Sequence, residues 1–171
     1  MRTLIPSDEL QGRIDQLAAD IARDYEGKTP VLVCVLKGAI FFLADLARRL
    51  DFDLELEFMA VSSYGASTET SGVVRILKDL DTDIEGRHIL IVEDIIDSGL
   101  TLQYLTRSLW SRNPASIEIV TLLSKPSRRT AELPCKYTGF EIENEFAVGY
   151  GLDHAEKYRN LPFIGVLDDP A

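Results

Sequence analysis

Two short apolar runs constrain the fold of this chain more than any other feature of its sequence. The runs are VLVCVL (31–36) and the ILIV within HILIVE (88–93). An unbroken apolar strand of this length is typical of a parallel sheet, because helices cover both of its faces. Each run is followed by a segment with helical character, at 39–50 and at 100–110. This alternation predicts an α/β fold with a mostly parallel central sheet flanked by helices.

The other elements follow from similar patterns. Apolar residues at helical spacing from Leu10 to Tyr25 predict an N-terminal helix that Ser7 caps and that Gly27 ends. Further strands are predicted at 54–61, 73–80, 116–123, 138–142, 146–150 and 163–167. No repeat and no long linker divides the chain of 171 residues, so we expect a single domain.

Charge and composition exclude several functions. A net charge of −10 would repel a phosphate backbone, so a nucleic-acid partner is not expected. The longest apolar runs are far shorter than the roughly 20 residues that span a bilayer, which predicts no membrane association and a cytoplasmic location. The two cysteines, Cys34 and Cys135, lack the spacing of a zinc site and are interpreted as structural thiols.

The segment ILIVEDIIDSGLT (89–101) places acids and hydroxyls directly after a core strand. Ligands of parallel sheets bind beyond the carboxyl ends of the strands, where Glu93 and Asp94 are expected. The following Ser98 and Gly99 lead into a helix whose N-terminal N–H groups would bind an anion. The sequence has neither a Walker motif nor a dinucleotide-binding glycine motif. We therefore predict a site for one monophosphate, with acids nearby for sugar hydroxyls or Mg²⁺.

This segment resembles the signature of the type I phosphoribosyltransferases, in which two acids and a D-[ST]-G-x-T loop bind phosphoribosyl pyrophosphate. Four other segments, within about 31–167, resemble parts of the hypoxanthine-guanine phosphoribosyltransferases in the same order. They are VLKGAIFF, SSYG, LLSKPSRR and FAVGYGLDHAEKYRNLPFIGVL. The resemblance implies the type I phosphoribosyltransferase fold, with a core at about 31–130 and a small hood formed by the N- and C-terminal segments.

The resemblance also implies an activity in purine salvage. The 5-phosphoribosyl group of phosphoribosyl pyrophosphate would pass to hypoxanthine or guanine, giving IMP or GMP and pyrophosphate, with Mg²⁺ as cofactor. Family analogy suggests a homodimer or homotetramer. The alternatives are an enzyme that prefers xanthine and a non-catalytic regulator that senses phosphoribosyl pyrophosphate.

Residue by residue, the resemblance assigns Glu93 and Asp94 to the ribose hydroxyls, directly or through Mg²⁺. Asp97 would lie near N7 of the base, either as a general base or as a stabiliser of positive charge on the purine; the sequence leaves both roles open. The 5-phosphate loop would consist of Asp97, Ser98, Gly99, Leu100 and Thr101.

Matches to the family's remaining segments complete the expected site. Pyrophosphate binding is expected from Lys37, Gly38 and Arg159, beneath a lid that includes Ser63 and Tyr64. Purine binding is expected from Lys125, Phe146, Ala147 and Asp153. Asp153 also matches a ligand of a second Mg²⁺, and the neighbouring His154 replaces a residue that is often aromatic in relatives.

Overall fold

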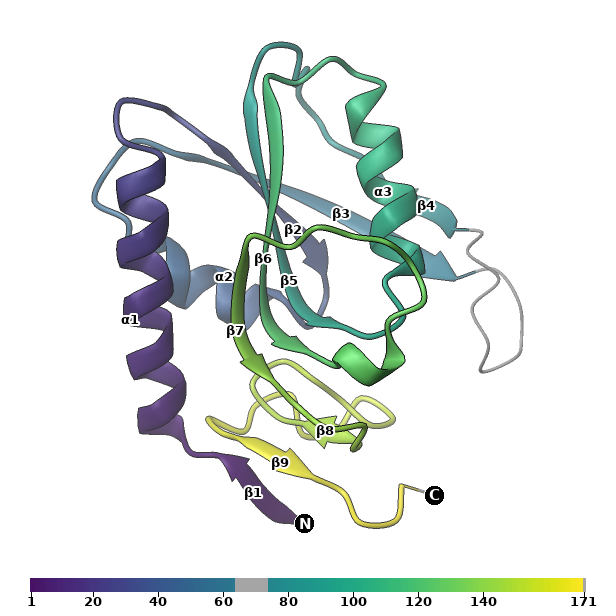
Figure 1. Cartoon of the computed structure of the whole chain (residues 1–171). Coiled ribbons are helices and arrows are strands. Elements are labelled where there is room, and N and C mark those ends of the chain that lie inside the picture. The colour runs from purple at the N-terminus through teal and green to yellow at the C-terminus, as the bar shows by residue number, and fades with distance from the viewer. Residues whose placement is uncertain (64–73, 171) are drawn as a thin grey trace.

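The computed structural model describes residues 1–63 and 74–170, which form a large sheet and a small one (Figure 1). The large sheet has the strand order β4-β3-β2-β5-β6-β7 and is parallel except for the antiparallel edge strand β4. Its strands are β2 (Val31–Leu36), β3 (Glu55–Ser63), β4 (Val74–Lys78), β5 (His88–Ile96), β6 (Ser116–Ser124) and β7 (Tyr137–Glu141). The predicted mostly parallel sheet is confirmed.

Helices cover both faces of this sheet. One core lies beneath α1 (Ser7–Asp24) and α2 (Ile40–Ala47) and includes Leu10, Phe42 and Leu90. A second core lies beneath α3 (Leu100–Trp110) on the opposite face. Alternate residues of β5 point into the two cores, which explains why its sequence is apolar without alternation.

The strand order reverses between β2 and β5, the two central strands. After β2 the chain crosses through α2 to β3 on one side, and after β5 it crosses through α3 to β6 on the other. The pairing of β2 with β5 ends at Cys34 and Val92, whereas the pairing of β5 with β6 continues to Ile96. The two central strands therefore diverge at their carboxyl ends, which is where ligands bind in sheets of this kind.

The small sheet joins the two ends of the chain. It consists of β1 (Arg2–Ile5), β9 (Ile164–Val166) and β8 (Ala147–Val148), in that order and antiparallel. The arrowheads of β6 and β7 point toward this sheet, so it lies beyond the carboxyl edge of the large sheet (Figure 1). It matches the expected hood of terminal segments.

Three local features differ from the sequence-based prediction. Pro6, not Ser7, occupies the position before α1, and within the described residues no side chain caps this helix. Strand β5 continues past Glu93 and Asp94, because its pairing with β6 extends through Ile95 and Ile96. Strand β1 was not predicted at all.

Two predictions from composition can also be compared with the structure. Over residues 1–63 and 74–170, no helix is long and apolar enough to cross a membrane. Cys34 and Cys135 are free, and burial raises the pKa of both thiols, to about 12 for Cys34, which agrees with a structural role.

Candidate active site

Two adjacent carboxylates lie where β2 and β5 diverge. Glu93 and Asp94 are only partly exposed, and burial raises the pKa of both carboxyl groups above the ordinary range. The charge of Asp94 raises the pKa of Glu93 further, whereas the charge of Arg159 opposes the shift at Asp94. In the ligand-free protein, the negative charge of this carboxylate pair is therefore only partly compensated by neighbouring groups.

Gly38 brings the loop after β2 directly against this acid pair. A Cβ atom at position 38 would lie 2.0 Å from Oδ2 of Asp94, so only glycine allows the approach. On its other side, the carbonyl oxygen of Gly38 would lie 2.0 Å from a Cβ atom at Gly151 in the segment after β8. The loop after β2 is thus packed between the acids of the large sheet and the hood.

Two cations beside this loop share one carboxylate. Lys37 Nζ lies 3.4 Å from Oε2 of Glu156, and Arg159 Nη2 lies 3.4 Å from Oε1 of the same side chain. Arg159 also donates to the carbonyl oxygen of Gly151 at 2.6 Å and lies 3.3 Å from Asp153. The two cations therefore define an anion-binding position that Glu156 occupies in the free protein.

The segment after β5 forms a cavity of about 200 Å³ at the N-terminus of α3. Gly99 adopts φ +86°, a left-handed conformation, and its carbonyl accepts the first helical bond from Gln103. Ser98 Oγ accepts a bond from the backbone N–H of Leu100. The cavity is lined by Glu93, Ile95, Ile96, Asp97, Ser98, Gly99, Thr101, Leu102 and Arg128. Its position at a helix N-terminus suits a phosphate group.

A second cavity, of about 440 Å³, lies between the large sheet and the hood. Lys125, with a side chain that is almost fully buried, and Phe146 both line it. The ring of Phe146 makes an edge-to-face contact with His154, with ring centroids 5.2 Å apart. Arg2 of β1 lines the same cavity and pairs with Glu145. The cavity thus offers an aromatic face and the ammonium group of a largely buried lysine to a flat polar ligand.

Comparison with known proteins identifies the family of this chain. The model of the phosphoribosyl transferase domain matches residues 6–155. The chain belongs to the phosphoribosyltransferase family. The hypoxanthine-guanine phosphoribosyltransferase of Bacillus subtilis is 54% identical over 166 residues, covering 97% of this chain and 92% of the relative. The corresponding enzyme of Mycobacterium bovis is 53% identical over 171 residues, covering 96% and 85% of the two chains.

Solved structures of phosphoribosyltransferases have the same fold. A hypoxanthine phosphoribosyltransferase from Staphylococcus aureus has a TM-score of 0.95 and 48% identity, covering 98% of this chain and 91% of that chain. A hypoxanthine-guanine phosphoribosyltransferase from Bacillus anthracis has a TM-score of 0.94 and 48% identity, covering 98% of both chains. These comparisons confirm the predicted family, fold and enzyme class.

The structure brings most of the predicted site residues to one edge of the phosphoribosyltransferase fold. Asp94 contacts Gly38, Glu93 precedes it on β5, and Arg159 lies on the hood side of the same loop. Ala147 and Asp153 do not line the cavity that contains Lys125 and Phe146. Ser63 is the last residue of β3, and Tyr64 lies outside the described residues. Assignment of ligands to these positions stays a proposal.

Sequence reasoning missed three residues of this edge. Glu156 belongs to no motif that points to a site, and its link to Lys37 spans 119 positions. Arg2 was missed because four residues at the start of the chain give a weak strand signal. Arg128 was given no role of its own within the LLSKPSRR segment, although it lines the cavity beside the phosphate loop. The available signal was the position of Arg128, a cation only three residues after the predicted purine-binding residue Lys125.

The acid pair makes stability depend on pH in the metal-free protein. A carboxyl group whose pKa is higher in the folded protein than in the unfolded chain destabilises the fold at high pH. The destabilisation develops as the pH rises from the unfolded-state pKa of about 4.3 through the folded-state pKa. We expect Glu93→Gln to raise the free energy of unfolding at pH 7.5 by about 1 kcal/mol, with a smaller gain near pH 4. The amide oxygen can still accept the bond that Glu93 Oε1 receives from the N–H of Asp94.

Urea denaturation at the two pH values measures this effect. The exposed Glu85→Gln variant is the control and should change stability by less than about 0.5 kcal/mol at either pH. Equal stability of Glu93→Gln and the wild type at pH 7.5 would contradict the charge argument.

Glu156 should compete with an anionic ligand for its two cations. We expect Glu156→Gln to bind inorganic pyrophosphate several-fold more tightly than the wild type. In the variant, pyrophosphate does not have to displace a carboxylate from Lys37 and Arg159. Isothermal titration calorimetry measures the affinity. Glu132→Gln, which removes one negative charge at another exposed position, is the matched control. Weaker binding to Glu156→Gln would mean that Glu156 supports the site.

Proposed function

We propose that this chain transfers the 5-phosphoribosyl group of phosphoribosyl pyrophosphate to hypoxanthine or guanine, giving IMP or GMP and pyrophosphate. The bond from C1 of the ribose to pyrophosphate breaks, and a bond from C1 to a purine nitrogen forms while that nitrogen loses its proton. The observation that carries the proposal is the contact of Gly38 with Asp94, which joins the loop proposed for pyrophosphate to the acids proposed for ribose. The relatives' names agree with it.

The sugar would lie across the divergence of β2 and β5. Its 5-phosphate would occupy the cavity of the loop from Asp97 to Thr101, and its hydroxyls would face Glu93 and Asp94. The pyrophosphate would replace Glu156 between Lys37 and Arg159. Holding all three parts of the substrate in one orientation lowers the entropic cost of the transfer.

The acid pair fits a magnesium ion. Mg²⁺ prefers oxygen ligands and commonly takes one or two carboxylates together with substrate phosphates and water. Over the described ranges, no group of three or more His, Cys, Asp or Glu side chains is placed to hold a metal, so substrate oxygens would have to complete the coordination of Glu93 and Asp94. Bound Mg²⁺ would supply positive charge to the leaving pyrophosphate. Asp153 is paired with Arg159, and we propose it for a second Mg²⁺ only by family resemblance.

The purine would enter the cavity between the large sheet and the hood. Lys125 would donate to the 6-oxo group, which favours hypoxanthine and guanine over adenine, and Phe146 would stack on the ring. The backbone N–H of Lys125 bonds the carbonyl of Ile96, one residue before the phosphate loop, at 3.0 Å. This bond keeps the base cavity beside the sugar. A cytoplasmic location and a homodimer or homotetramer remain predictions.

Nucleotide formation tests the proposal directly. Purified protein is incubated with phosphoribosyl pyrophosphate, Mg²⁺ and one base at a time: hypoxanthine, guanine, xanthine, adenine or uracil. We expect IMP and GMP, and no product when EDTA replaces Mg²⁺. Faster XMP formation would identify a xanthine-preferring enzyme. No nucleotide from any base, with phosphoribosyl pyrophosphate still bound, would overturn the proposal in favour of a sensor.

Asp97 is the residue that we propose to act on the base in the transition state. Asp97→Asn should therefore lower kcat by about 100-fold or more, while the affinity for phosphoribosyl pyrophosphate changes little. Steady-state kinetics and ligand titration measure the two effects. An unchanged kcat would remove Asp97 from the mechanism.

A further inference from the structure

A short turn after β6 is fastened onto the proposed phosphate loop. The carbonyl oxygen of Ser98 accepts bonds from the backbone N–H groups of Thr130 and Ala131 at 3.0 and 3.1 Å. On the other side of the turn, Lys125 is bonded to Ile96. A 3-10 helix, η1 (Pro126–Arg128), lies between these attachments. Both ends of the turn are thus fixed to the backbone on either side of Asp97.

This attachment places Arg128 over Asp97. The Nε atom of Arg128 donates to Oδ1 of Asp97 at 3.0 Å, and both residues line the cavity at the N-terminus of α3. Among residues 1–63 and 74–170, no acceptor contacts the two Nη groups of Arg128. The guanidinium therefore presents its outer edge as a pair of hydrogen-bond donors beside the cavity.

The charges around the cavity are unbalanced for a phosphate dianion. Glu93 and Asp97 both line it, and each would repel the ligand. Within the described part of the chain, Arg128 is the one cationic side chain in the lining. A helix N-terminus carries only about half a positive charge. Among the described residues that line the cavity, Arg128 is thus the side chain that can neutralise a bound phosphate.

We propose that Arg128 is a further binding residue for the ribose 5-phosphate, and that it holds Asp97 in place through Nε while its Nη groups bind the phosphate. The planar fork of arginine suits two phosphate oxygens at once. The proposal rests on the assignment of the 5-phosphate to this cavity.

A purely structural role for the pair is disfavoured by its exposure. The side chains of Arg128 and Asp97 are 49% and 48% exposed, and ion pairs with this exposure contribute little to the stability of a fold. The backbone bonds of the turn do not involve the Arg128 side chain, so they should persist when it is shortened. Loss of the guanidinium should therefore change ligand binding and leave the fold intact.

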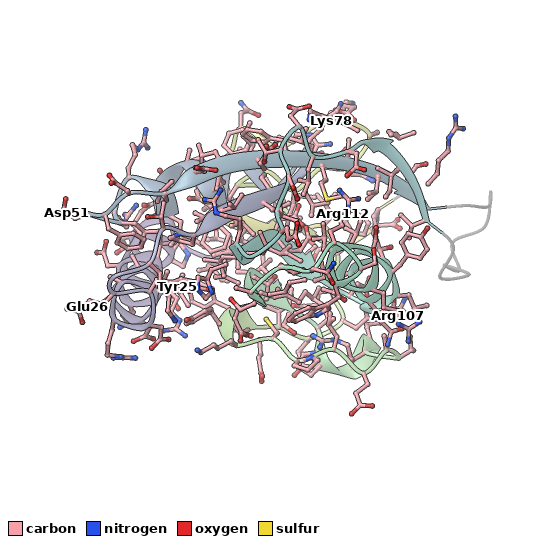
Figure 2. The ribbon with its side chains drawn as sticks, turned by 90° about the horizontal axis from the view of Figure 1, so that it is seen from above. Tyr25, Glu26, Asp51, Lys78, Arg107 and Arg112 are labelled. Carbon is pink, nitrogen blue, oxygen red and sulfur yellow. The ribbon has the colours of Figure 1, made fainter. Side chains whose placement is uncertain are left out.

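The test compares Arg128→Ala, Arg128→Lys and the wild type as full-length proteins. Calorimetry measures binding of ribose 5-phosphate, of unphosphorylated ribose and of inorganic pyrophosphate. We expect Arg128→Ala to weaken ribose 5-phosphate binding by about tenfold, with pyrophosphate binding unchanged and with partial recovery in Arg128→Lys. The matched control is Arg107→Ala: this exposed residue of α3 lies at the outer edge of the molecule (Figure 2), and its loss should change none of these affinities.

Two outcomes would overturn the proposal. Wild-type affinity of Arg128→Ala for ribose 5-phosphate would remove Arg128 from the site. Equal weakening of ribose 5-phosphate and pyrophosphate would indicate a general structural effect.

Failure of the proposed function gives a different result. The wild type would then form no nucleotide, yet the comparison of ribose 5-phosphate with ribose would still report on Arg128. If the wild type bound ribose 5-phosphate and ribose equally, the phosphate would not lie in this cavity. That result would overturn the proposed role of Arg128 as well.

Discussion

The divergence of β2 and β5 determines the position of every other part of the site. Both strands are buried on two faces, and their pairing stops at Cys34 and Val92 because the chain turns to opposite sides of the sheet after them. Glu93 and Asp94 follow at this point, where burial raises the pKa of their carboxyl groups. Ionisation of the two acids therefore opposes folding of the free protein, and a ligand that brings positive charge and hydroxyl groups would lower that cost.

A series of close contacts connects this acid pair to the hood. Asp94 touches Gly38, the carbonyl of Gly38 touches Gly151, and the carbonyl of Gly151 accepts a bond from Arg159. A side chain at position 38 or 151 would separate these layers. The hood is therefore placed by packing against the loop after β2, and its own strands are held by the pairing of the chain's two ends. Substrate groups bound at this junction would contact both parts of the fold at once.

The sequence predicted best those site residues that lie together in one continuous segment. The segment from Glu93 to Thr101 carries acids, hydroxyls and a glycine in one stretch, so its chemistry was visible without a structure. Arg159 was assigned only by family resemblance, because its approach to the acids depends on the folding of the hood. Glu156 and Arg128 were missed for the same reason, since their partners lie far away in the sequence. Ser7 was assigned wrongly because the pattern does not separate a cap from a first helical residue preceded by proline.

Glu93 and Asp94 form a pair whose negative charge is only partly compensated in the free protein, and a cationic ligand would complete the compensation. The most direct test is a pH titration of their carboxyl carbons by ¹³C NMR, before and after addition of Mg²⁺ and phosphoribosyl pyrophosphate. We expect the pKa of Glu93 to lie well above the ordinary value of about 4.3 in the free protein, and the ligands to lower it. An ordinary pKa for both carboxyl groups, unchanged by the ligands, would mean that their charge is already compensated in the free protein.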